Sequence, residues 1–115
     1  THDPELLQRH VERCFALGEQ FGRLVEQSPD FELATAPPAN IVCFRHLPAH
    51  LRGDPGALDA HQSGLRQTLL RAADHYLVQT RLRRRAYLRV TFMNPATGEA
   101  QLRHLLDDLR RAAAA

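Results

Sequence analysis

The stretch from Tyr87 to Leu109, "YLRVTFMNPATGEAQLRHLLDDL", constrains the fold more than any other part of the chain. Its first six residues alternate strictly, with Leu88, Val90 and Phe92 between Tyr87, Arg89 and Thr91. Successive side chains of a strand point to opposite faces of a sheet, so one set enters a core. We therefore expect a strand, a break at Asn94-Pro95 and a helix. Arg89 lies mid-strand on the face away from the core.

Three further strands are predicted. The stretches "HYLVQTRL" and "RAYLRVTF" indicate two strands joined by a tight basic turn at Arg83 to Arg85. A short strand is expected from Phe31 to Ala34, followed by a Pro-Pro turn. The β-rich run from Ile41 to Leu47 is apolar on both faces at first, as in a central strand. Arg45 shares a face with Ile41 in this strand, and "PAHLRGDPG" after it is expected to be a loop.

Three helices complete the prediction. The first 29 residues are expected to form a long helix, with Asp3 as cap, Pro4 at the first helical position and its end at Ser28-Pro29-Asp30. Its apolar stripe is expected to contain Leu7, Val11, Cys14, Gly18, Phe21 and Val25. A second helix is predicted from Ala57 to Asp74, with Leu58, Leu65, Leu69 and Ala72 on one side. Thr97 is expected to cap the last helix, whose buried stripe would be Leu102, Leu105, Leu106 and Leu109.

The predicted order is α-β-β-α-β-β-α, which indicates an α+β fold with a small antiparallel sheet covered by helices on one face. With 115 residues, the chain suits a single domain spanning 1–115. Within it, residues 30–115 form the α+β body. Residues 1–29 are expected to be a connector-like helix, and the start at Thr1 without a methionine suggests a piece of a longer protein.

Composition excludes several classes of function. The chain is 43% hydrophobic and 24% charged, with a net charge of +2. No apolar run approaches the roughly 18 residues that span a bilayer, and no secretory leader is present, so we expect a cytoplasmic protein without membrane contact. Cys14 and Cys43 are expected to be packed thiols. All 15 basic residues are arginine, so Schiff-base chemistry on a lysine is impossible here.

Arg89 is the main candidate for a binding residue, and Arg45 is a weaker one. A guanidinium held on a strand could bind a carboxylate through two parallel hydrogen bonds. The alternative is a solvated arginine in an exposed row with Tyr87 and Thr91. By pattern alone, the sequence contains no self-sufficient catalytic set.

Two other basic motifs favour ordinary structural roles. His46 and His50 have a spacing that could bind a metal on a helix, but Pro48 lies between them and no further ligands complete a zinc site. We expect them to be loop histidines at the surface and expect no metal. The run "RLRRRAYLR" could contact nucleic acid, but a solvated hairpin turn is favoured because the overall charge is small.

Three stretches together resemble a known family: "NIVCFRHLP" (Asn40 to Pro48), "YLVQTRL" (Tyr76 to Leu82) and the opening segment, Tyr87 to Leu109. In this order and spacing they resemble the C-terminal small domain of group II pyridoxal-phosphate-dependent amino-acid decarboxylases. This family includes glutamate, aromatic amino acid and diaminobutyrate decarboxylases. The wording "FMNP" and "CFR" is most similar to the diaminobutyrate-like branch, whereas Arg84 stands where the family often has a glycine.

The resemblance implies a lyase that decarboxylates an amino acid with pyridoxal 5'-phosphate (PLP) and works as a homodimer in amino-acid (carboxylic acid) metabolism. In the family, the cofactor and the Schiff-base lysine belong to a large upstream domain, which is absent from this chain. The fragment alone is therefore not expected to be active. The family's carboxylate-binding arginine lies at the same spacing before Asn-Pro as Arg89 does before Asn94-Pro95. Arg89 is thus expected to bind the substrate carboxylate, with Arg45 and Asn94 as weaker candidates.

Two alternatives remain open from the sequence. The chain could be a stand-alone α+β module that binds a small ligand or a partner without catalysis. It could also bind nucleic acid through the stretch from Arg81 to Arg89, although we expect no such partner. The resemblance implies that the chain closes an active site formed mainly by the large domain.

Overall fold

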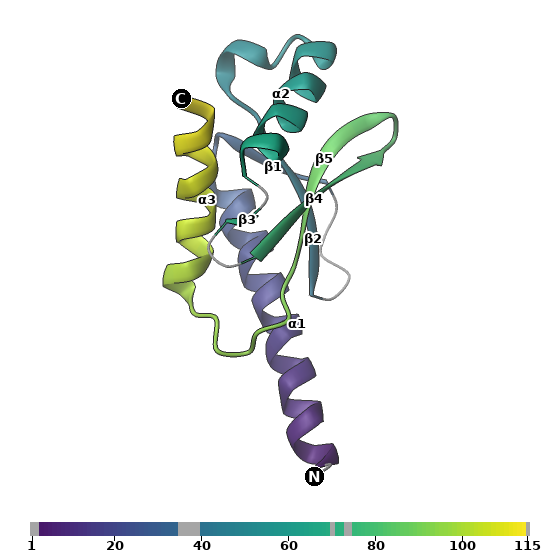
Figure 1. The fold of residues 1–115 in the computed structure, drawn as a ribbon, viewed down its shortest axis with the longest axis vertical. Helices are drawn as coiled ribbons and strands as arrows, with labels where there is room; N and C mark the ends of the chain where they lie inside the picture. Colours follow the sequence, from purple (N-terminus) through teal and green to yellow (C-terminus); the bar gives the residue numbers. More distant parts are fainter. Residues whose placement is uncertain (1–2, 35–39, 70, 73–74, 115) are drawn as a thin grey trace.

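The computed structural model describes residues 3–34, 40–69, 71–72 and 75–114. Along the chain, the elements are α1 (Pro4–Gln27), β1 (Phe31–Leu33), β2 (Ile41–His46), the 3₁₀ turn η1 (Ala49–Leu51), α2 (Pro55–Thr68), β3 (Arg71–Ala72), β4 (His75–Leu82), β5 (Arg85–Thr91) and α3 (Glu99–Ala114). The predicted α+β class and element order are confirmed, with β3 and η1 as additions (Figure 1). The Pro-Pro turn lies outside the described residues.

The strands form one antiparallel sheet in the described part of the chain, in the order β1-β2-β5-β4-β3. β5 is therefore central, between β2 and β4. Arg89 of β5 is paired with Cys43 of β2 on one side and with Val78 of β4 on the other. This double pairing fixes the backbone of Arg89 within the most internal strand.

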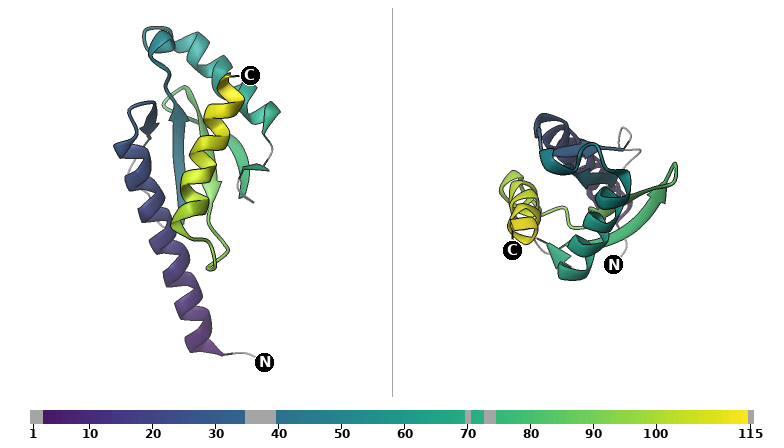
Figure 2. Two further views of the ribbon diagram at one scale, coloured as in Figure 1. Left: turned by 90° about the vertical axis from the view of Figure 1, so that its left-hand side faces the viewer. Right: turned by 90° about the horizontal axis from the view of Figure 1, so that it is seen from above.

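The helices pack on one face of this sheet, where the hydrophobic core lies (Figure 2). Phe21 of α1 is fully buried at the centre of the core. Its ring meets Phe44 at 5.2 Å and Phe92 at 5.4 Å in edge-to-face geometry, which aromatic pairs favour. The predicted α3 stripe is confirmed, because Leu102, Leu105, Leu106 and Leu109 are all buried in this core. The opposite face of the sheet carries no helix of the described chain.

α1 begins and ends as predicted. The Asp3 carboxylate accepts hydrogen bonds from the backbone N–H groups of Glu5 and Leu6, and Ser28 is the C-terminal cap. The predicted stripe is wrong in its first half, where Leu7 is 54% exposed and Val11 is 40% exposed. The reason is visible in Figure 1, where the N-terminal half of α1 extends beyond the end of the sheet and so lies outside the hydrophobic core. From Cys14 onward the predicted stripe is buried.

α2 is shorter than predicted. It ends at Thr68, and Leu69 is already extended. Ala72, predicted to be helical, instead pairs with His75 in the β3–β4 ladder. Pairing with β4 satisfies the backbone hydrogen-bonding groups of this segment, and this pairing outweighs the helical spacing of its apolar residues. Residues 70, 73 and 74 of the predicted helix lie outside the described residues.

The connection into α3 also differs from the prediction. The helix starts at Glu99, so Gly98 and not Thr97 precedes it. The Gln101 side chain accepts the backbone N–H of Gly98 at 2.9 Å, which satisfies one free donor of the helix start. Thr97 is buried, and its carbonyl oxygen accepts a hydrogen bond from Arg13 of α1 at 2.8 Å.

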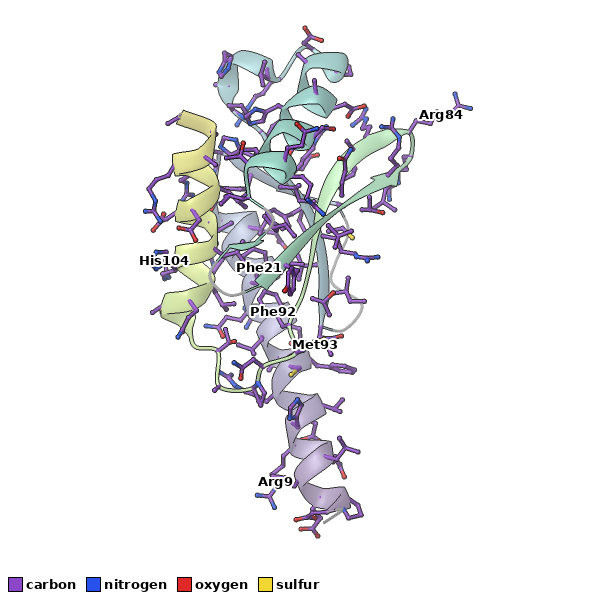
Figure 3. All side chains as sticks on the ribbon, in the orientation of Figure 1. Arg9, Phe21, Arg84, Phe92, Met93 and His104 are labelled. Carbon is purple, nitrogen blue, oxygen red and sulfur yellow. The ribbon has the colours of Figure 1, made fainter. Side chains whose placement is uncertain are left out.

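The predicted tight turn between β4 and β5 is present at Arg83 and Arg84. Both residues have left-handed backbones, with φ of 52° and 67°. Such angles match the hairpin turns that usually contain Asn-Gly. Arg84 lies at the tip and points away from the body (Figure 3). None of the described helices is long and apolar enough to cross a membrane.

Candidate functional site

The helix-free side of the sheet, called the open face below, carries the predicted carboxylate-binding residue. Strand alternation and pairing bring together on it Ile41, Cys43 and Arg45 from β2, Tyr76 and Val78 from β4, and Tyr87, Arg89 and Thr91 from β5. Several of these side chains are exposed or half-buried although apolar. An uncovered apolar sheet face is typical of a surface that binds a partner or a ligand.

Arg89 lies at the centre of the open face and is exposed. Its guanidinium makes no hydrogen bond or ion pair with any described residue. The strand pairing holds its Cα from both sides, so the side chain projects from a fixed base. An unpaired guanidinium held in this way is available to an anionic group.

Cys43 is the direct neighbour of Arg89 on β2. Cys43 is half-buried, so the expectation of a packed thiol is only partly met at this residue. Burial raises the pKa of Cys43, and the positive charge of Arg89 opposes this rise. Both cysteines are free thiols, as predicted, and burial also raises the pKa of Cys14.

Arg45 lies on the same face, but its charge is already neutralised. Only 5% of the residue is exposed. Its Nε donates to Glu32 Oε1 at 2.7 Å, and its guanidinium lies 5.4 Å from the centre of the Tyr87 ring. Tyr87 is buried beneath it, so the predicted exposed row of Tyr87, Arg89 and Thr91 is wrong at Tyr87. Arg45 therefore has a structural role, as the cation of an ion pair with Glu32.

Asn94 lies beyond the end of β5 in the connection to α3. Its side-chain oxygen accepts the backbone N–H of Ala96 at 3.0 Å, and its carbonyl oxygen accepts that of Thr97. These bonds form the turn that ends the strand. The side chains of Arg45 and Asn94 are thus engaged in local contacts, whereas the Arg89 guanidinium remains available to bind an anionic group.

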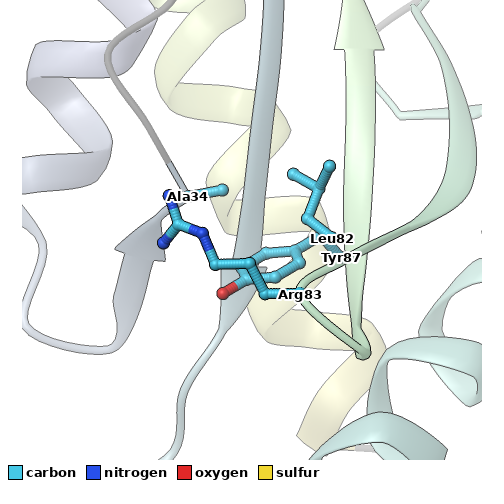
Figure 4. A pocket seen from close by; sticks show the side chains of 4 residues that line it. All are labelled: Ala34, Leu82, Arg83 and Tyr87. Carbon is cyan, nitrogen blue, oxygen red and sulfur yellow. The ribbon is translucent and has the colours of Figure 1, made fainter.

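A small hollow of about 100 Å³ lies beside the Arg45 pair. It is lined by Ala34, Leu82, Arg83 and Tyr87, and Figure 4 shows the Arg83 side chain passing the Tyr87 ring toward Ala34. The left-handed turn directs Arg83 back over the sheet in this way. The hollow is small compared with pockets that enclose a ligand.

A second uncovered surface lies on the N-terminal half of α1. It exposes Leu6, Leu7, Val11 and Phe15. Beside it is a hollow of about 170 Å³ lined by His10, Val11, Cys14, Phe15, Asn40 and Met93. His10 Nε2 lies 3.1 Å from the carbonyl oxygen of Met93, which ties α1 to the end of β5. This apolar stripe, like the open face, is typical of a surface covered by a partner.

His46 is placed differently from the prediction. It is 6% exposed and lies at the end of β2, where its Nδ1 is 2.9 Å from Nε2 of His61 on α2. His50 is exposed in η1. In the part of the chain that the structure describes, no three His, Cys, Asp or Glu side chains come together in a way that would hold a metal ion.

Comparison with known proteins shows a shared fold. No family model and no curated protein matches the chain. The glutamate decarboxylase domain of a diaminobutyrate-pyruvate transaminase and L-2,4-diaminobutyrate decarboxylase from Vibrio parahaemolyticus is 21% identical, with a TM-score of 0.83 over 96% of this chain and 23% of that chain. Mouse CSAD is 22% identical, with a TM-score of 0.81 over 93% and 24%. Oryza sativa TDC with PLP and tryptamine is 20% identical, with a TM-score of 0.76 over 94% and 23%.

The similarity extends over nearly all of this chain but over only part of each solved structure. The chain spans about a quarter of the length of these solved structures. Their low sequence identity shows that they share the fold with this chain, over nearly all of its length. The expected fold is therefore confirmed as one found within decarboxylase structures.

Sequence reasoning missed Glu32 as the partner of Arg45. The two residues are opposite each other in the β1–β2 ladder, but they lie 13 positions apart in the sequence. Only the strand register brings them together, and a one-residue shift would place Glu32 on the core face. Opposite charges on two predicted strands were the only available signal.

Proposed function

We propose that this chain is the C-terminal small domain of a PLP-dependent L-amino-acid decarboxylase, and that Arg89 binds the carboxylate of the substrate. The observation that carries the proposal is the contrast between two arginines on one sheet face. Arg45 is buried and paired with Glu32, whereas Arg89 is exposed and has no hydrogen-bond or ion-pair partner among the described residues. The fold shared with decarboxylase structures supports it.

The chemistry of Arg89 suits this role. A guanidinium binds a carboxylate through two parallel hydrogen bonds and so fixes its orientation as well as its position. The Cα of Arg89 lies on a strand that is paired on both sides, which limits the movement of the side chain. The binding must remain moderate, because decarboxylation removes the negative charge from this group in the transition state.

The residues of this chain do not fit the role of holding PLP by a Schiff base, since the chain has no lysine. PLP supplies an electron sink for decarboxylation where it is bound. We therefore assign the cofactor to a large domain outside this sequence and give this chain the task of binding and orienting the substrate.

The two uncovered surfaces support this arrangement. We propose that the large domain covers the open face, so that Arg89 closes over the substrate. Residues 1–29 would act as the connector, with the exposed apolar residues of α1 packed against the rest of the protein. A homodimer in the cytoplasm and a substrate of the diaminobutyrate-like branch, within amino-acid metabolism, are further parts of the proposal.

The test uses the intact protein, with its upstream large domain. Arg89→Ala should lower kcat/KM for the preferred amino acid by about 100-fold or more, because a hydrogen bond to a charged group contributes about 1.5–3 kcal/mol and the fork makes two. Arg85→Ala is the matched control, since Arg85 is also exposed on β5. It should retain kcat/KM within about twofold.

Wild-type turnover in Arg89→Ala would contradict the role of Arg89. An intact protein that neither binds PLP nor releases CO₂ from any amino acid would contradict the decarboxylase proposal as a whole. It would instead favour a non-catalytic α+β binding module, in which the same open face and Arg89 would serve a partner.

A further inference from the structure

His46 and His61 form a paired titratable site on the helix-covered side of the sheet, away from Arg89. Nδ1 of His46 and Nε2 of His61 are 2.9 Å apart. A neutral imidazole has one donor and one acceptor nitrogen, so one ring must donate to the other. Once both rings are protonated, every ring nitrogen is a donor, and the hydrogen bond is replaced by repulsion between two cations.

The surroundings offer little compensation for a second positive charge. His46 Nε2 lies 3.7 Å from Asp30, the only carboxylate paired with it among the described residues. Asp30 is already engaged by Arg110 of α3, with hydrogen bonds of 2.7 and 3.0 Å. On the other side, His50 of η1 acts on His61 as a further potential cation. The charge of Asp30 raises the pKa of His46, and the charge of Arg110 opposes this rise.

The pair lies where α2 is fastened to the sheet. The Gln62 side chain of α2 is fully buried and accepts the backbone N–H of His46 at 3.0 Å. It also donates to the His46 carbonyl oxygen at 2.7 Å. The His46 ring packs 4.9 Å from the Phe31 ring, and His46 pairs with Phe31 across β1 and β2. Loss of the imidazole contact would therefore weaken the attachment of α2 to β2.

The direction of the proton linkage follows from burial. Burial is the largest cause that lowers the pKa of His46 and of His61, and the second cause is the charge of His61 for His46 and the charge of His50 for His61. In the unfolded or opened chain each ring titrates at about 6.5. The opened state thus binds more protons just below this value, so the stability of the closed state is present above about pH 6.5 and falls as the pH is lowered.

We propose that His46 and His61 form an acid-sensitive latch, which fastens α2 to β2 at neutral pH and releases it when both imidazoles are protonated. The latch is a regulatory property of this chain. It does not depend on the proposed decarboxylase function.

Hydrogen exchange of the α2 amides tests the latch on the 115-residue chain. After correction for intrinsic rates, exchange at pH 5.5 should exceed that at pH 7.5 by about tenfold for each unit by which the pair's pKa is lowered. The α3 amides serve as the internal reference. His61→Gln keeps an amide in place of the ring but cannot titrate, so its α2 exchange should change less than about twofold.

His104→Gln is the matched control, because His104 is an exposed histidine on α3 whose ion-pair partner among the described residues is Asp108, one turn away. This variant should keep the full wild-type response of α2. An identical pH response in His61→Gln and wild type would overturn the latch, as would a wild-type α2 without any pH response.

A second measurement requires no variant, so it decides the question even if His61→Gln does not fold. In the wild-type chain with ¹⁵N-labelled histidine, a scalar coupling between His46 Nδ1 and His61 Nε2 should be present at pH 7.5. It should disappear on acidification, together with the closed-state signals of α2. No coupling at pH 7.5, or a coupling that survives while both rings are protonated, would overturn the proposal.

Discussion

Arg45 of β2 and Glu32 of β1 form an ion pair that joins these two strands at one edge of the sheet, with 2.7 Å between Arg45 Nε and Glu32 Oε1. The Arg45 side chain is 7% exposed and that of Glu32 is 39% exposed, so the pair is buried on the arginine side and partly screened on the other. It leaves Arg89 as the available guanidinium near the centre of the open face.

Removing Glu32 should destabilise the chain by leaving Arg45 buried without its partner. Glu32→Ala is expected to lower the free energy of unfolding by about 1–3 kcal/mol, below the full cost of breaking a buried pair because Glu32 is partly exposed. Urea unfolding measures the change. Glu26→Ala, at an exposed position of α1, is the control and should stay within about 0.5 kcal/mol. Equal stability of both variants would show that Arg45 does not depend on Glu32.

The hairpin tip should be improved by glycine. Arg84 has φ of 67°, a region that costs a side-chain-bearing residue about 1–2 kcal/mol. Arg84→Gly is therefore expected to raise the free energy of unfolding by about 0.5–1 kcal/mol, after the entropy that glycine adds to the unfolded chain. Arg85→Gly, one position later and within β5, should lower it by a similar amount. A loss of stability in Arg84→Gly would contradict the left-handed turn.

The thiol of Cys43 should report on Arg89. The positive charge of Arg89 acts against the rise in the pKa of Cys43 that burial causes. Arg89→Ala removes this charge, so the pKa of Cys43 should rise further and alkylation by iodoacetamide at pH 8 should slow by about two- to fivefold. Mass spectrometry of the Cys43 peptide gives the rate, with Arg85→Ala as control. Faster alkylation in Arg89→Ala than in the control would contradict the proximity of the two side chains.

Two phenylalanines of α1 separate its packed half from its uncovered half. Phe21 is fully buried between Phe44 and Phe92, so Phe21→Ala should cost about 3–5 kcal/mol of stability. Phe15 is 44% exposed, and Phe15→Ala should change stability of the 115-residue chain by less than about 1 kcal/mol. Urea unfolding of both variants provides the comparison. Similar losses would mean that the first half of α1 also packs on the core.

Local patterns predicted β1, β2, β4 and β5, the caps of α1 and the stripe of α3, because these depend on residues close together in the sequence. The same alternation placed Arg89 on the face away from Leu88 and Val90. The exposure of Leu7 and Val11 could not be predicted, since it depends on where the sheet ends beside α1. The burial of His46 depends on its contact with His61, and the end of α2 depends on the pairing of Ala72 with His75. These are tertiary contacts, which outweigh local preference.

The proposed binding of the substrate carboxylate by Arg89 can be tested by a thermodynamic cycle. Binding of the preferred amino acid and of its amide, which lacks the carboxylate, would be measured for the intact wild-type protein and for Arg89→Ala. We expect the wild type to bind the acid about 100-fold more tightly than the amide, and Arg89→Ala to bind the two within about threefold of each other. An equal preference for the acid in both proteins would contradict the claim.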